Sequence, residues 1–120
     1  MGIVRTGEVS KVNYKKGLVQ VMYADLDNKV TDEMPCLSRG ETTLPSVGDT
    51  VAVVHMDNGI EDGICLGKIF TETQTPTYQE KGEFYKELGK GASISTQDGK
   101  ITFTDTSGSI TLEEIIERRG

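Results

Sequence analysis

The sequence predicts an all-β protein in two parts, a small N-terminal barrel and a C-terminal ribbon of strands that ends in a short helix. Three observations favour this class. Apolar and polar residues alternate with a period of two in several short segments. Fourteen glycines, together with many Ser, Thr and Asp residues, indicate frequent turns between these segments. A helical spacing of apolar residues appears only near the C-terminus.

The first part is predicted to be a small β-barrel, because it contains five short strand-like segments with glycine at their bends. Gly7 is expected to mark a bulge or bend in the first strand, and Gly67 a bend in the last. Pro35 indicates that the third strand is an edge or irregular strand, because proline cannot donate to a ladder. A tight turn is predicted at residues 57–59, and the charged segment 25–33 is expected to be a loop. The five strands are expected at 5–12, 18–24, 34–37, 50–56 and 63–70.

A boundary is predicted after the barrel, because residues 71–81 are polar, contain Pro76 and show no apolar period. We therefore expect a barrel over residues 1–70, a linker over 71–81 and a second part over 82–120. Within the second part, residues 82–88 are compatible with a strand that leads into the ribbon.

The ribbon, residues 92–112, alternates apolar and polar side chains through three predicted strands. Tight turns are expected at Asp98-Gly99 and at Ser107-Gly108. The apolar side chains are too few to offset the entropy lost when the segment becomes ordered, so a lone ribbon is not stable in water. Either the ribbon packs as an ordinary meander on its own domain, or it is a strip of an intertwined oligomer. The apolar positions are Ile94, Ile101, Phe103, Ile110 and Leu112.

A short helix is predicted at the C-terminus, over residues 112–118. Thr111 and Glu114 fit the capping-box pattern, and Leu112, Ile115 and Ile116 have helical spacing. A helix this short is unstable alone, so it must pack against other parts of the structure.

Charge and composition exclude several classes of function. The net charge of −6 argues against a protein that binds nucleic-acid phosphates or an anionic membrane surface. No signal peptide and no run of 18 apolar residues is found, so we expect synthesis and folding in the cytoplasm and no stable membrane association. Cys36 and Cys65 are not in a CxxC spacing, and reduced, packed thiols are favoured over a disulfide.

The sequence offers no catalytic constellation, so an enzyme, a cofactor and a metal are not expected. No GxSxG motif is present. His55 alternates with Val51 and Val53, which favours a core or rim position over a catalytic base. The acidic residues of segment 25–33 lack the glycine and terminal Glu of an EF-hand, so a solvated loop is favoured over a calcium site.

The segment LPSVGDTVAVVHMDNGIEDGICLGKIF, residues 44–70, resembles the OB-fold domain of phage baseplate assembly protein V, the central-spike family of contractile tails related to the VgrG spike. The similarity lies in Leu44-Pro45, Val47-Gly48-Asp49, the Val51/Val53 strand, the turn at Gly59, Gly63 and Leu66-Gly67. Upstream, Gly7-Glu8-Val9 and residues 18–21 fit the first two strands of that family. The resemblance covers roughly residues 5–70.

The resemblance implies a homotrimer, in which the OB-fold is followed by a short intertwined β-helix or β-prism needle. It implies a structural role in a virion or phage-like particle, with a baseplate hub protein as partner. The sequence departs from the family, because it has no Trp near the third strand and no inserted lysozyme domain. Some needles end in an iron-binding HxH motif, but the one histidine of this sequence, His55, lies in the predicted barrel hairpin, so that metal site is not expected. The short needle makes direct membrane puncture doubtful and suggests a separate, PAAR-like tip protein. The residues expected to face the threefold axis are Ile94, Ile101, Phe103 and Ile110.

A different class of function remains open, an OB-fold module that binds single-stranded nucleic acid or oligosaccharide. Such modules use basic grooves and stacking aromatic residues. The aromatic candidates are Tyr14, Tyr23 and Phe70, in an acidic background.

Overall fold

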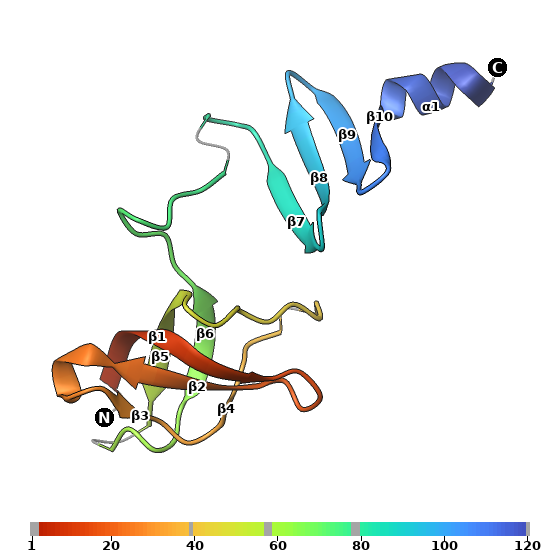
Figure 1. Ribbon diagram of the computed structural model, residues 1–120. Coiled ribbons are helices and arrows are strands. Elements are labelled where there is room, and N and C mark those ends of the chain that lie inside the picture. Colours follow the sequence, from red (N-terminus) through yellow and green to blue (C-terminus); the bar gives the residue numbers. More distant parts are fainter. Residues whose placement is uncertain (1–2, 39, 57–58, 78–79, 120) are drawn as a thin grey trace. The chain divides into compact units, whose positions relative to one another are not determined.

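The computed structural model describes residues 3–38, 40–56, 59–77 and 80–119. The chain divides into two compact units, Met1–Thr75 and Pro76–Gly120, which are described separately. The protein is mostly β, with one antiparallel sheet in each unit and one short helix at the C-terminus (Figure 1). The predicted all-β class with a terminal helix is therefore confirmed at this level. Among the described residues, no helix has the length and apolar character needed to cross a membrane.

The first unit contains a six-stranded sheet in the order β3-β2-β1-β5-β6, with β4 also paired to β2. The pairing ladders leave this sheet open, with β3 and β4 along one edge and β6 at the other. A short 3-10 turn, Ala24–Leu26, follows β2. The strands are β1 (Ile3–Asn13), β2 (Leu18–Tyr23), β3 (Lys29–Val30), β4 (Met34–Pro35), β5 (Thr50–His55) and β6 (Ile64–Lys68).

The core of the first unit is built from the alternating inward positions of these strands. In β2 and β5 every second residue is buried, which is the pattern expected of a half-buried sheet. His55 belongs to this set and is 1% exposed, so it is a core residue. The buried hydrophobic residues are Val9, Val19, Val21, Tyr23, Met34, Val51, Val53 and Cys65.

Gly7 is not the bulge that the sequence suggested. It pairs in regular register with Val51, and a Cβ atom at this position would lie 2.5 Å from Cγ1 of Val21. Glycine is therefore needed at position 7, because the side chains of Val21 and Tyr23 on β2 leave no room for a Cβ atom. The bulge of β1 lies instead between Val9 and Lys11, where the register with β2 shifts by one residue.

The charged segment 25–33 also differs from the expected loop, because it contains β3. Lys29 and Val30 pair with Tyr23 and Met22, but both are exposed, so no apolar alternation reveals the strand in the sequence. Of the turn predicted at 57–59, residues 57 and 58 lie outside the described part of the chain.

The second unit is a four-stranded antiparallel meander in the order β10-β9-β8-β7. Two of its turns have positive φ at both central residues, Lys90-Gly91 and Asp98-Gly99. This conformation matches the twist of the flanking strands in two-residue hairpins. The elements are β7 (Tyr85–Gly89), β8 (Ala92–Gln97), β9 (Lys100–Asp105), β10 (Gly108–Thr111) and α1 (Leu112–Arg119).

Candidate functional site: the apolar face of the second sheet

Three of the four residues predicted to line a threefold axis lie in one cross-strand row. Ile94 of β8 is paired with Phe103 of β9, and Phe103 is paired with Ile110 of β10. Ile101 lies two residues before Phe103 on the same strand, so it shares this face. The sequence-predicted positions are thus brought together on one side of the sheet. We call Ile94, Ile101, Phe103 and Ile110 the apolar face.

The opposite side of the same sheet carries hydroxyl groups. Ser95 is paired with Thr102, and Ser93 with Thr104. The hydroxyls of Thr104 and Ser109 are 2.9 Å apart and share a hydrogen bond. Ser95 is buried on this side, and Ser93, Thr102 and Thr104 are half-buried. Short polar side chains of this kind need less apolar cover than the isoleucines and phenylalanine of the apolar face.

The second unit has no hydrophobic core of its own among its described residues. Its one buried residue there is Ser95, whereas the first unit buries eight hydrophobic side chains. Phe103 remains 37% exposed, and the other residues of the apolar face are half-buried. A sheet of this size normally buries one face against another layer, so the second unit lacks a layer that covers its apolar face.

Helix α1 starts where the capping box predicted. The amide of Glu114 donates to Oγ1 of Thr111 at 3.1 Å, and the amide of Thr111 donates to Oε1 of Glu114 at 3.3 Å. Nζ of Lys100 lies 2.8 Å from Oε2 of Glu113, which links the helix to β9. The apolar side chains of the helix are still exposed, with Ile116 at 57%. The helix therefore adds to the uncovered apolar surface of this unit.

The aromatic residues proposed for base or sugar stacking differ in their solvent exposure in the first unit. Tyr23 is fully buried and its hydroxyl lies 2.6 Å from Nε2 of His55, so it is not available to a ligand. Tyr14 is 71% exposed and Phe70 is 67% exposed. Expecting Tyr23 to stack on a ligand was therefore wrong. The alternation that places it beside Val19 and Val21 was the signal for its burial.

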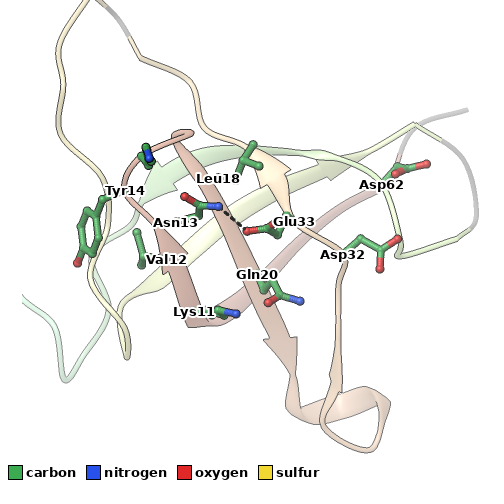
Figure 2. Close-up of a pocket in the computed structure, with 10 residues that line it drawn as sticks. Lys11, Val12, Asn13, Tyr14, Leu18, Gln20, Asp32, Glu33 and Asp62 are labelled. Atoms are coloured by element: carbon green, nitrogen blue, oxygen red, sulfur yellow. Dashed lines mark hydrogen bonds between the residues drawn. The ribbon is translucent and has the colours of Figure 1, made fainter.

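A broad groove of about 1030 Å³ lies beside the β1–β2 hairpin of the first unit (Figure 2). Lys11 is paired with Gln20 across the hairpin, and Nδ2 of Asn13 donates to Oε2 of Glu33 at 3.1 Å. Asp32 and Glu33 lie between β3 and β4, and both line this groove. The lining combines Lys11 and Lys15 with the carboxylates of Asp32, Glu33 and Asp62. This mixture of charges does not form the basic track that a phosphate backbone requires.

Within the described ranges, no group of three or more His, Cys, Asp or Glu residues has the arrangement of a metal site. Both cysteines are free thiols. No local pattern in the sequence pairs Cys36 with Cys65, because only the fold of the first unit brings them together.

Comparison with known proteins assigns no family to this chain. No protein-family model matches the sequence, and no curated protein matches it at a significant level. The relation to the spike family accordingly stays a prediction that depends on the motif residues in 5–70.

Proposed function

We propose that this chain is a structural protein of the central spike in a contractile tail or phage-like injection particle, and that it acts as a homotrimer. In this proposal the first unit is an OB-fold that joins the baseplate hub. The second unit is one strip of a short trimeric β-needle. A separate tip protein completes the needle, and the particle is assembled in the bacterial cytoplasm.

One observation carries the proposal: the described part of the second unit buries no hydrophobic side chain, although it forms four regular strands. Burial of apolar area is the main favourable term in folding. A sheet that buries so little within its own unit needs apolar surface from outside that unit. The cover has to be apolar and flat, because it must match the row Ile94, Phe103 and Ile110.

Other copies of the same chain supply such cover. Three copies that turn their apolar faces toward a common axis bury Phe103 and its neighbours against one another. They also pair or protect the outer strands β7 and β10, whose free edges otherwise invite aggregation. The hydroxyl-bearing side then faces water, which suits its serines and threonines. A rigid, intertwined structure of this kind transmits axial force from the contracting tail to the tip.

Neighbouring residues of β10 offer a matched test. Ile110 belongs to the apolar face, and Ser109 lies on the opposite side and is exposed. Ile110→Asp places a charge against the proposed axis, whereas Ser109→Asp places the same charge in water. The full-length variants are compared by size-exclusion chromatography with light scattering.

We expect Ser109→Asp to keep the trimeric mass and Ile110→Asp to shift the chain toward monomer or aggregate. Circular dichroism checks whether the first unit remains folded in both variants. Equal masses for Ile110→Asp, Ser109→Asp and the parent chain would contradict the assignment of this face to the interface.

The second candidate is an OB-fold binding module, and the groove beside Tyr14 is the observation that favours it. Its polar lining and exposed aromatic ring suit an oligosaccharide better than a nucleic acid, because carboxylates outnumber lysines there. A gel shift with single-stranded oligonucleotides at low salt and titration with oligosaccharides test this candidate. Tight binding that Tyr14→Ala abolishes would favour the module over the spike.

A further inference from the structure

Cys36 and Cys65 are adjacent on two different strand segments of the first unit. They form an isolated parallel bridge, and the amide of Leu37 donates to the carbonyl of Cys65 at 2.9 Å. Neighbouring strands are roughly 5 Å apart. Disulfides join Cα atoms that are about 4.4–6.8 Å apart. The backbone therefore already holds the two residues at a spacing that a disulfide accepts.

The two side chains also face each other. Each thiol perturbs the pKa of the other, which places the two side chains close together across the bridge. Cys65 is fully buried, while Cys36 is partly exposed and open to a small reagent. Burial, followed by the neighbouring Cys65, raises the pKa of Cys36 to about 12, so its thiolate is scarce at neutral pH and its reactions are slow.

The position of the pair in the sheet gives it a structural consequence. The ladders leave the six-stranded sheet open between the edge that contains β4 and the edge formed by β6. We call this gap the seam. Among the described residues, the Cys36–Cys65 bridge is the one backbone pairing across the seam. A covalent bond at this point would link the two edges of the sheet.

We propose that Cys36 and Cys65 form an intramolecular disulfide that closes the seam when the chain meets an oxidising thiol–disulfide environment. The Cys36 thiolate attacks a sulfur of a small disulfide such as oxidised glutathione and releases one glutathione thiolate. Cys65 loses its proton and attacks the Cys36 sulfur of the mixed disulfide, which releases the second glutathione. Two protein thiols are oxidised and one glutathione disulfide is reduced to two thiols.

Thiols stay reduced in the cytosol and become oxidised outside it. If the chain works in a particle that leaves the cell, as the proposed function requires, the seam is held by the backbone bridge alone during assembly and gains a covalent link after release. The disulfide chemistry itself needs only the geometry of the first unit and does not depend on trimer formation.

The test measures disulfide formation in the full-length chain equilibrated with reduced and oxidised glutathione, once in native buffer and once in concentrated urea. Samples are quenched with acid, and mass spectrometry separates the intramolecular disulfide from glutathione adducts. Equilibrating from both the reduced and the oxidised protein removes any dependence on slow access to Cys65. Cys36→Ser and Cys65→Ser are controls that form only adducts.

We expect the equilibrium constant for the intramolecular disulfide to be on the order of 100-fold larger in native buffer than in urea, because the fold holds the two thiols together. The oxidised chain should also unfold at a temperature about 10 °C higher than the reduced chain. An equal or smaller constant in native buffer, or adducts on both cysteines in place of the disulfide, would overturn the proposal. Because the first unit contains both cysteines, disulfide formation and trimer formation are tested independently of each other.

Discussion

The Tyr23 hydroxyl lies 2.6 Å from Nε2 of His55, and both side chains are buried in the core of the first unit. Nδ1 of His55 lies 2.7 Å from the carbonyl oxygen of Asp62, which can only accept, so Nδ1 carries the proton. Nε2 is then the acceptor for the hydroxyl of Tyr23. This chain of hydrogen bonds satisfies the polar groups of the core and ties β2 to β5 and to the segment before β6.

Removal of the Tyr23 hydroxyl is expected to destabilise the first unit. Tyr23→Phe leaves Nε2 of His55 buried without its partner, which costs about 1–3 kcal/mol. Urea unfolding followed by circular dichroism measures the loss. Tyr14→Phe is the matched control, because Tyr14 is exposed, and its unfolding midpoint should not change. An unchanged midpoint for Tyr23→Phe would show that the hydrogen bond contributes no net stability.

Stability is expected to fall at alkaline pH. Burial raises the pKa of Tyr23 from 10.0 to about 12 and that of Cys36 from 9.0 to about 12. The folded state thus favours the neutral forms, and the unfolded chain ionises first. The stability that the raised pKa values of Tyr23 and Cys36 give to the folded state is complete below about pH 9. It is lost as the pH rises from about 9 to 12. Unfolding midpoints measured from pH 7 to 11.5 check this, and Tyr23→Phe with Cys36→Ser should flatten the curve.

Gly7→Ala is expected to destabilise the first unit by about 1–3 kcal/mol, since the added methyl group overpacks the core. The new Cβ would lie 2.5 Å from Cγ1 of Val21 and 2.7 Å from the ring of Tyr23. Thermal unfolding measures the effect. Thr6→Ala, an exposed position on the same strand, is the control and should change stability by no more than about 0.5 kcal/mol. A neutral Gly7→Ala would refute close packing at this site.

The capping box of α1 can be tested separately. Thr111→Ala removes the hydroxyl that accepts from the amide of Glu114, and loss of such a cap costs about 1 kcal/mol. Hydrogen exchange of the helix amides should become faster by roughly fivefold as a consequence. Ser109→Ala serves as control on the preceding strand. Unchanged exchange in Thr111→Ala would show that other contacts hold the helix start.

The sequence predicts the local elements well where a short-range pattern exists. Strict alternation located the three strands within 92–112, and the Thr111/Glu114 pattern located the start of α1. β3 was missed because Lys29 and Val30 are both exposed, so they produce no alternation. Gly7 was misinterpreted because a glycine needed for close packing cannot be distinguished in sequence from one in a bulge.

Contacts between residues far apart in the chain could not be predicted from the sequence. The bridge between Cys36 and Cys65 and the hydrogen bond between Tyr23 and His55 join residues about thirty positions apart, and only the fold brings them together. By contrast, the shared face of Ile94, Phe103 and Ile110 follows from alternation and turn positions, both of which are local. What covers this face cannot be read from local patterns, because the described residues of the second unit do not supply the cover.

Sedimentation equilibrium of the full-length chain at micromolar concentration is the most direct test of the proposed trimer. We expect a single species of three times the 13.1 kDa chain mass, about 39 kDa. A stable 13.1 kDa species whose second unit resists hydrogen exchange would contradict it, because that sheet would then be stable without other copies covering Phe103 and its neighbours.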